Sequence, residues 1–295
     1  MNRIILFGKL GQLGWELSRT LAPLGEIYAF DRSEIDISRP DGLAKAFREV
    51  NPTVVVNASA YTAVDEAESD PALAMAVNAS APRLMAELSC QHRAALIHFS
   101  TDYVFDGMKG EPYREADPPN PLNVYGKSKL EGEIAVQNVG GIYLIVRTSW
   151  VYSLRRESFV TKVLTWARQQ ESLQIVADQV SNPTWSRMLA EATAQLIAQA
   201  GRDTQGWLGE RSGLYHLAGE GYASRFDWAR EIVALYPRKE ELTVREILPA
   251  RTEDFPTPAR RPLFSALDCE KFSRVFGLRL PDWRVALRMA MEDQG

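Results

Sequence analysis

Short runs of β-favouring residues alternate with helical stretches along the first 150 residues of this chain. The predicted strands are Ile4–Phe7, Ile27–Phe30, Val54–Asn57, Leu96–Phe99 and Tyr143–Val146. Strands that are joined through helices pair in parallel, so the pattern predicts a parallel sheet covered on both faces. Val54, Val55 and Val56 are all apolar, as expected for a central strand that is buried on both sides.

After Trp150 the pattern changes to helical stretches that are separated by irregular segments. The predicted helices are Phe159–Gln170, Arg187–Ala200 and Phe226–Leu235, and one further strand is predicted at Gly213–Leu217. A length of 295 residues allows two domains of about 150 residues each. We therefore predict a first domain over residues 1–150, to which the chain returns at about residues 187–217, and a smaller C-terminal α/β domain over residues 151–295.

Charge and cysteine usage exclude several classes of protein. The formal net charge is -4, from 34 Lys and Arg against 38 Asp and Glu, which argues against nucleic acid or a membrane surface as a partner. The two cysteines, Cys90 and Cys269, cannot form a disulfide framework or a Cys-x-x-Cys zinc site, and the three histidines lack metal-ligand spacing. The apolar run Ile4–Phe7 is too short for a signal peptide, and no stretch approaches the roughly 20 apolar residues of a membrane span. We expect a cytoplasmic protein with no membrane partner and no metal site built on these residues.

A glycine-rich turn follows the first predicted strand. Gly8, Gly11 and Gly14 open a helix that we predict from Gln12 to Leu24. Glycines at this spacing permit a tight turn, let the backbone approach a pyrophosphate and let the helix pack closely on the strand. The helix N-terminus points unpaired N–H groups at the anion. The motif predicts a Rossmann-type, doubly wound sheet that binds a nucleotide, with a purely structural glycine turn as the alternative.

Further candidate residues lie at the carboxyl ends of the predicted strands. Asp31 ends the second strand, where a carboxylate accepts hydrogen bonds from an adenosine ribose, whereas Arg32 beside it suits a 2′-phosphate. These two residues therefore leave NADH and NADPH open. The remaining candidates at strand ends are Asp36, Ile37, Ala60, Tyr61 and Thr62. Open α/β sheets bind ligands at such ends, although a turn and a polar strand end fit these residues equally well.

Tyr125 and Lys129 lie four residues apart at the start of a predicted helix, so they share a helix face. The preceding loop, Gly107–Asn123, contains four prolines that exclude a helix or a central strand. A nearby ammonium lowers the pKa of a phenol, which suits Tyr125 to pass a proton to a developing alkoxide near neutral pH. Thr101 and Asp102 follow the fourth strand at the same sheet edge, where a hydroxyl can contact both the substrate oxygen and the tyrosine. Alone, they also fit a turn that closes a strand.

These motifs, in this order, resemble the extended short-chain dehydrogenase/reductase family. Within it, the chain resembles the dTDP-4-dehydrorhamnose reductases over nearly its full length, through the segments Gly8–Gly14, Ser100–Phe105, Asn123–Gly126, Arg147–Tyr152 and Pro258–Pro262. The resemblance implies reduction of the C4 ketone of dTDP-4-dehydro-L-rhamnose to dTDP-L-rhamnose, the last step in the synthesis of that nucleotide sugar. It implies NADPH as the cofactor, with NADH as an alternative, a dTDP-sugar as the substrate, and a substrate-binding C-terminal domain.

The resemblance also implies roles for single residues. Together with the strand-end residues, the expected cofactor site is Gly8, Gly11, Gln12, Leu13, Gly14, Asp31, Arg32, Asp36, Ile37, Ala60, Tyr61, Thr62, Tyr125 and Lys129. Tyr125 is expected to be the general acid, and Lys129 to bind the nicotinamide ribose and tune Tyr125. Thr101 and Asp102 are expected to contact the sugar and adjust the tyrosine, and Trp150 to contact the sugar nucleotide.

Some members of the family bind magnesium through C-terminal glutamates at a dimer contact. Here the C-terminus offers Glu292 and Asp293, so magnesium and a homodimer stay open. Arg260 and Arg261 fit a clamp for the substrate diphosphate or a solvated basic turn. The indole of Trp150 likewise fits packing as well as ligand contact.

Two other functions share this fold. A nucleotide-sugar dehydratase or epimerase oxidises and re-reduces its substrate, but dehydratases of this family place a glutamate where this chain has Tyr103. A non-catalytic regulatory subunit, resembling the β subunit of methionine adenosyltransferase, keeps the nucleotide-binding domain as a scaffold. Tyr103 at the position of that glutamate disfavours dehydration, and the intact set of Thr101, Tyr125 and Lys129 favours a reductase over the regulatory subunit.

Overall fold

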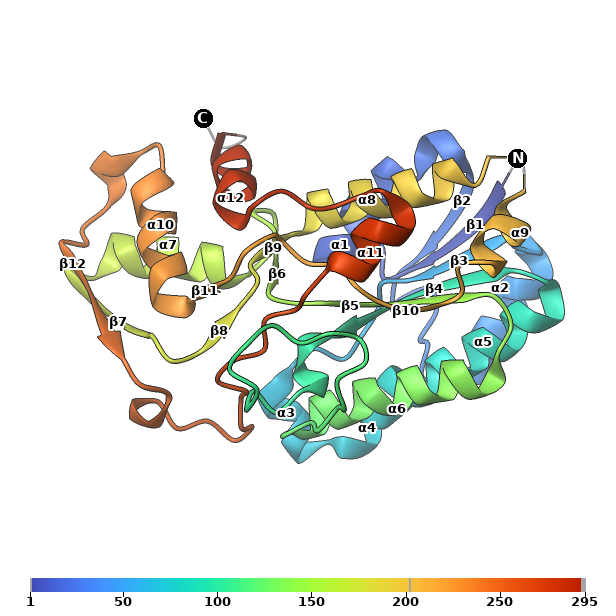
Figure 1. Cartoon of the computed structure of the whole chain (residues 1–295), viewed down its shortest axis with the longest axis horizontal. Helices are drawn as coiled ribbons and strands as arrows, with labels where there is room; N and C mark the ends of the chain where they lie inside the picture. Colours follow the sequence, from blue (N-terminus) through green and yellow to red (C-terminus); the bar gives the residue numbers. More distant parts are fainter. Residues whose placement is uncertain (1, 202, 293–295) are drawn as a thin grey trace.

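The computed structural model describes residues 2–201 and 203–292. Its central sheet has six parallel strands in the order β10-β5-β4-β3-β1-β2 (Figure 1). The strands are β1 (Asn2–Phe7), β2 (Gly25–Phe30), β3 (Val54–Asn57), β4 (Ala95–Thr101), β5 (Tyr143–Thr148) and β10 (Gly213–His216). Each predicted strand is therefore present, and the doubly wound Rossmann-type fold is confirmed. The strand predicted to end at Phe99 continues through Ser100 and Thr101.

Helices cover both faces of the sheet and bury one apolar core on each (Figure 1). On one face pack α1 (Gln12–Thr20), α8 (Ser186–Gln199), α9 (Thr204–Gly209) and α11 (Glu270–Phe276). On the other pack α2 (Pro40–Val50), α5 (Ala81–His92) and α6 (Val124–Val139). In α2 the buried residues Leu43, Ala46, Phe47 and Val50 recur at helical spacing, which explains why this segment lies on the sheet as a helix. The short helices α3 (Val64–Ser69) and α4 (Pro71–Met75) and the π-helical turn Ala76–Ser80 lead into α5.

The first helix is shorter than predicted. We expected a helix to Leu24, but α1 ends at Thr20 and Ala22–Leu24 form a 3-10 turn. Pro23 has no N–H to donate, and its ring clashes with the carbonyl of the preceding turn, so the α-helix cannot continue through it.

Apart from the two cores on the sheet, the chain forms a separate apolar core around Tyr152, Trp228 and Trp283, which we call the second core. Its helices are α7 (Phe159–Gln169), α10 (Arg225–Leu235) and α12 (Trp283–Glu292). Its strands pair as β6 (Val151–Tyr152) with β9 (Thr184–Trp185), β7 (Ser172–Val176) with β12 (Glu246–Ala250), and β8 (Val180–Ser181) with β11 (Ala223–Ser224). Figure 1 shows these elements beside the sheet, with α8 leading the chain back to it. The second return, through α11, was not predicted.

The order of the strands fixes where a ligand can bind. β1 lies between β2 and β3, and the chain winds outward in opposite directions from this point. The loops that leave the carboxyl ends of β1 and β3 therefore diverge and open a crevice between them, which is the usual ligand site of such sheets. No helix within the described residues is long and apolar enough to cross a membrane.

Candidate active site

A cleft of about 940 Å³ lies at the carboxyl ends of the sheet strands. It brings together most of the predicted site residues from the loops after β1 to β5. Those that line it are Gly8, Gly11, Gln12, Leu13, Asp31, Arg32, Asp36, Ile37, Ala60, Tyr61, Thr62, Thr101, Asp102, Tyr125, Lys129 and Trp150. Gly14 and Arg260 are absent from this lining.

Each of the three glycines of the first turn is required for a different structural reason. Gly8 has a φ of 92°, and a Cβ there would lie 2.9 Å from the carbonyl carbon of Ala58, so the turn leaves no room for a side chain. Gly11 is the N-cap of α1 and gives it no side-chain cap, which leaves the helix N-terminus available to an anion. A Cβ on Gly14 would lie 2.0 Å from the Gly8 carbonyl oxygen. Gly14 therefore sets the close packing of α1 on the turn and does not line the cleft.

Asp31 and Arg32 differ in whether their side chains already have partners within the protein. The Asp31 Oδ1 atom accepts hydrogen bonds from the backbone N–H (2.7 Å) and hydroxyl (2.6 Å) of Ser33. These bonds lower the pKa of the Asp31 carboxyl. The Arg32 guanidinium lines the cleft, and no carboxylate within residues 2–201 and 203–292 forms an ion pair with it. A free cation thus lies at the end of β2.

The loop after β3 is held by a residue that sequence reasoning missed. Asn78, in the π-helical turn, accepts a hydrogen bond from the Tyr61 N–H (2.9 Å) and donates to the Tyr61 carbonyl (3.0 Å). Its amide also donates to the Ser128 hydroxyl in α6 (2.9 Å). Asn78 therefore ties the cleft wall at Tyr61 to the helix that carries Tyr125 and Lys129. The extra residue of a π turn leaves no reliable signal in a single sequence.

Tyr125 and Lys129 lie on one face of α6 and both line the cleft. The helix begins where Asn123 accepts a hydrogen bond from the Gly126 N–H (2.7 Å). The Lys129 Nζ atom is buried and donates to the Phe99 carbonyl (2.7 Å) at the end of β4. Burial lowers the pKa of Lys129 to about 8, and the nearby Glu133 carboxylate acts in the opposite direction.

The pKa of Tyr125 differs from our expectation. Burial raises it above the ordinary value, and a hydrogen bond between the Thr101 hydroxyl and the phenol opposes that shift. The predicted lowering of the Tyr125 pKa by the Lys129 ammonium is therefore wrong: desolvation raises this pKa, and Lys129 is not among the groups that shift it. A phenol that stays protonated remains able to donate a proton.

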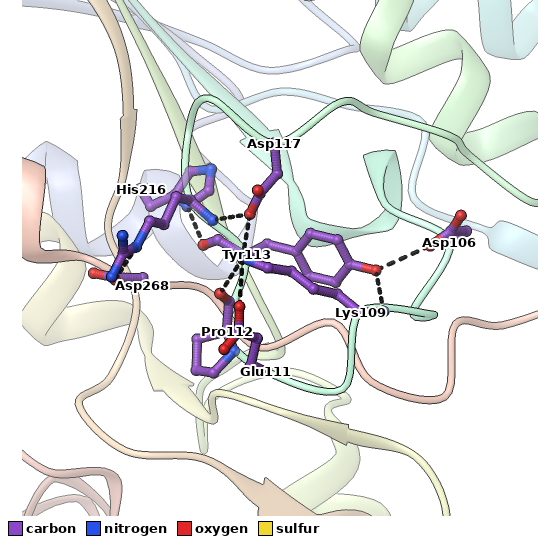
Figure 2. A network of polar contacts seen from close by, with 9 residues as sticks. Asp106, Lys109, Glu111, Pro112, Tyr113, Asp117, His216 and Asp268 are labelled. Atoms are coloured by element: carbon purple, nitrogen blue, oxygen red, sulfur yellow. Dashed lines mark hydrogen bonds and ion pairs between the residues drawn. The ribbon is translucent and has the colours of Figure 1, made fainter.

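A polar network fixes the proline-rich loop that leads into α6 (Figure 2). The Tyr113 phenol donates to Asp106 (2.9 Å), and Lys109 donates to Asp117 (2.6 Å). The Nδ1 atom of His216, at the end of β10, lies 3.1 Å from the Tyr113 carbonyl. The loop is thus anchored to the sheet without regular secondary structure, which fixes the start of the helix that bears Tyr125.

A buried ion pair lies behind the Tyr125–Lys129 pair. Glu133, one turn after Lys129, accepts hydrogen bonds from Arg147 (shortest 2.6 Å) and from the Ser100 hydroxyl (2.5 Å). Glu133 and Arg147 are 1% and 3% exposed, so each charge depends on the other for compensation. Neither residue was predicted as a site residue, although Glu133 continues the four-residue spacing of Tyr125 and Lys129.

Asp102 links the sheet to the second core. Its Oδ2 atom accepts hydrogen bonds from Ser181 (3.0 Å) and Ser265 (2.5 Å), which both lie far along the chain. Burial raises the pKa of Asp102 to about 6, against the lowering effect of these hydroxyls. Asp102, which lines the cleft and bonds these two distant serines, is well placed to contact a ligand that lies between the sheet and the second core.

Trp150 adopts an unusual backbone conformation at the end of β5. Its φ is 41°, in the left-handed region that a bulky residue rarely adopts, and such strain is often found at functional sites. The indole stacks on Trp228 with ring centroids 5.5 Å apart, and the Arg225 guanidinium lies 3.7 Å from its ring centroid. Trp150 therefore both packs and lines the cleft. Arg225, which also hydrogen-bonds the Tyr103 phenol, was missed because no local pattern marks it.

The two adjacent arginines near the C-terminus have different surroundings. Arg260 is exposed and lies outside the lining of the cleft, so the structure does not bring it to the other site residues. Arg261 forms an ion pair with Asp65 (2.6 Å) and hydrogen-bonds the Tyr103 phenol. Of the C-terminal acidic pair, Asp293 lies outside the described residues. No group of three or more His, Cys, Asp and Glu side chains in the described part of the chain is arranged to hold a metal ion.

Comparison with known proteins adds to this geometry. The family model described as the RmlD substrate binding domain matches residues 1–294. The dTDP-4-dehydrorhamnose reductase of Burkholderia thailandensis is 44% identical over 294 residues, which cover 99% of this chain and 98% of that one. The enzyme of the same name from Escherichia coli K12 is 42% identical over 296 residues, with coverages of 98% and 97%. The crystal structure of dTDP-4-dehydrorhamnose reductase from Bacillus anthracis in complex with NADP is 33% identical, covers 99% of both chains and has a TM-score of 0.89.

Proposed function

Because the chain belongs to the family of dTDP-4-dehydrorhamnose reductases, which are oxidoreductases, we propose that it reduces the C4 ketone of dTDP-4-dehydro-L-rhamnose to dTDP-L-rhamnose. The observation that carries the proposal is the meeting of Thr101, Tyr125 and Lys129 with the glycine-rich turn in one cleft. A nucleotide cradle beside a proton donor is what reduction of a ketone requires.

Tyr125 is the proton donor of this proposal. When bound, NADPH supplies the hydride that reduces the C4 carbon. Burial keeps the Tyr125 phenol protonated at neutral pH, so that the proton is available when charge develops on the C4 oxygen. The Thr101 hydroxyl lowers the pKa of the phenol, which favours the phenolate that remains after transfer.

Lys129 is proposed to hold the ribose of the nicotinamide. Its ammonium is buried at the end of β4 and keeps one hydrogen bond to the Phe99 carbonyl, which leaves two further donors. With a pKa of about 8, the group is mostly charged at neutral pH.

The cofactor cradle fits NADPH. Gly8 permits the tight turn at the end of β1, and the uncapped N-terminus of α1 suits the pyrophosphate. Arg32 supplies an unpaired cation for a 2′-phosphate, whereas the Oδ1 atom of Asp31 is already engaged by Ser33. The NADP complex of the Bacillus anthracis relative supports the same preference. NADH as an alternative donor stays a prediction.

The sugar nucleotide is proposed to lie between Asp102 and Trp150, towards the second core. Arg225 and Arg260 are both absent from the lining of the cleft, but the Arg225 guanidinium lies over the ring of Trp150, a lining residue, which supports Arg225 as the partner of the substrate diphosphate. The substrate-binding role of the C-terminal part and the cytoplasmic location stay predictions, and a homodimer and magnesium stay open.

The proposal is tested by replacing Tyr125 with phenylalanine. We expect Tyr125→Phe to lower kcat by about 100- to 10,000-fold, which is the usual contribution of a general acid, while NADPH affinity stays close to that of the unaltered chain. Tyr143→Phe, on β5 and outside the cleft lining, is the control for loss of a phenol. Turnover by Tyr125→Phe at the unaltered rate contradicts the assignment.

A further inference from the structure

The turn between β6 and α7 lies on the glycine-rich turn. Arg155 donates a hydrogen bond to the Leu10 carbonyl (3.0 Å), and Arg156 donates to the same oxygen. The Gln12 amide, at the start of α1, donates to the Val151 carbonyl in β6 (3.4 Å). A segment that lies about 140 residues further along the chain thus borders the proposed pyrophosphate site.

This turn is held in place by its own hydrogen bonds. Ser158 donates to the Ser153 carbonyl (2.9 Å), which closes the turn across Arg155 and Arg156. Ser158 and Thr161 form a reciprocal capping box that fixes the start of α7. The backbone that carries the two arginines is therefore constrained, so little further ordering is needed for one of them to meet a ligand.

The two arginines differ in what their side chains can reach. The Arg155 guanidinium lies over the Trp15 ring, 3.8 Å from its centroid, and is absent from the lining of the cleft. Arg156 lines the cleft together with Gly11 and Gln12. Arg156 is thus the member of the pair that faces a bound nucleotide.

Arg156 carries an uncompensated charge. In the described ranges, 2–201 and 203–292, no carboxylate forms an ion pair with it. Its neighbour Glu157 is paired with Lys162 (2.9 Å), and Lys9, in the glycine-rich turn, is paired with Glu34 (2.5 Å). Arg156 is therefore the cation beside this turn that remains available to an anion.

We propose that Arg156 binds the diphosphate of NADPH, as a second anchor opposite the N-terminus of α1. The inference rests on the cofactor of the proposed function. In the described part of the cleft the cations are Arg32, Arg156 and Lys129. Arg32 suits the 2′-phosphate and Lys129 the ribose, which leaves Arg156 for the diphosphate. A guanidinium has five N–H donors in a planar fork that matches two phosphate oxygens, and the Leu10 carbonyl occupies one of them.

The test is the affinity of the purified chain for NADPH and for NADH, measured by titration calorimetry without sugar. We expect Arg156→Ala to weaken both cofactors about 10-fold, because both contain the diphosphate. Arg155→Ala is the matched control, because Arg155 also donates to the Leu10 carbonyl but does not line the cleft. Its affinity for both cofactors should stay within about twofold of that of the unaltered chain. Arg32→Ala should weaken NADPH alone.

Four results overturn the inference. Unchanged affinity of Arg156→Ala for both cofactors means that the guanidinium does not reach the diphosphate. A loss for NADPH but not for NADH assigns Arg156 to the 2′-phosphate instead. A loss confined to the dTDP-sugar, with cofactor affinity unchanged, assigns it to the substrate diphosphate. Failure of the unaltered chain to bind either cofactor overturns the proposed function, and this inference with it.

Discussion

Burial, more than neighbouring charge, decides the protonation of the residues that carry the proposed chemistry. The spacing of Tyr125 and Lys129 was enough to predict that they share a helix face. It was not enough to predict the pKa of Tyr125, because desolvation raises it and the Lys129 ammonium instead contacts the Phe99 carbonyl. Such a balance depends on distances of a few ångströms that a sequence does not contain.

The buried Lys129 makes stability depend on pH. Its pKa is about 8 in the folded chain against an ordinary value of 10.5, so between these values the unfolded chain binds more protons. Stability should therefore rise with pH through this window, relative to a chain without the group. We compare the free energies of unfolding of the unaltered chain and of Lys129→Met, measured by urea unfolding at each pH. From pH 7 to pH 10, the free energy of unfolding of the unaltered chain should rise by roughly 2–3 kcal/mol more than that of Lys129→Met.

Lys129→Met also loses the hydrogen bond to Phe99, which changes its free energy of unfolding by an amount that does not depend on pH. The pH dependence of the difference between the two chains is therefore the informative quantity. Lys127→Met provides the control, since Lys127 is an exposed lysine of the same helix. If the free energies of unfolding of Lys129→Met and of the unaltered chain change in parallel with pH, burial of the Lys129 ammonium does not destabilise the fold.

At the scale of elements, the glycine-rich turn could be predicted from the sequence, but the different roles of its glycines could not. The spacing of Gly8, Gly11 and Gly14 predicted a strand, a turn and a helix, and all three are present. Only the structure separates Gly8, which lines the cleft, from Gly14, which packs α1 on the turn. The early end of α1 follows from Pro23. The prediction extended the helix past this residue because the apolar positions keep a helical period up to Leu24.

Gly14→Ala tests the packing role. Alanine is the better helix former by about 1 kcal/mol, but the added methyl would lie 2.0 Å from the Gly8 carbonyl oxygen, so α1 must move away. We expect a loss of about 3 kcal/mol in the free energy of unfolding, together with weaker NADPH binding.

Gly209→Ala is the matched helical control, because a methyl there meets only Ile142 at an ordinary 3.8 Å. It should leave stability unchanged or slightly raised. If Gly14→Ala behaves like Gly209→Ala, the close approach of α1 to the turn does not matter to the fold.

At the scale of the whole molecule, the candidate site is completed by contacts between distant segments. The sheet and the positions of the catalytic candidates could be predicted because they depend on patterns within about 20 residues. The partners of Asp102 could not, because Ser181 and Ser265 reach it only after the second core has formed. The same holds for Arg225 over Trp150 and for Arg156 on the glycine-rich turn.

The most direct measurement of the central claim is isotope transfer with the unaltered chain. The chain is incubated with dTDP-4-dehydro-L-rhamnose and NADPH that carries deuterium at both hydrogens of the nicotinamide C4, and the sugar product is analysed by proton NMR and mass spectrometry. Our account predicts dTDP-L-rhamnose with one deuterium at C4 of the sugar, formed in step with oxidation of NADPH. A product without deuterium at C4, a dehydrated or epimerised sugar formed without net oxidation of NADPH, or no turnover by a chain that binds NADPH would contradict it.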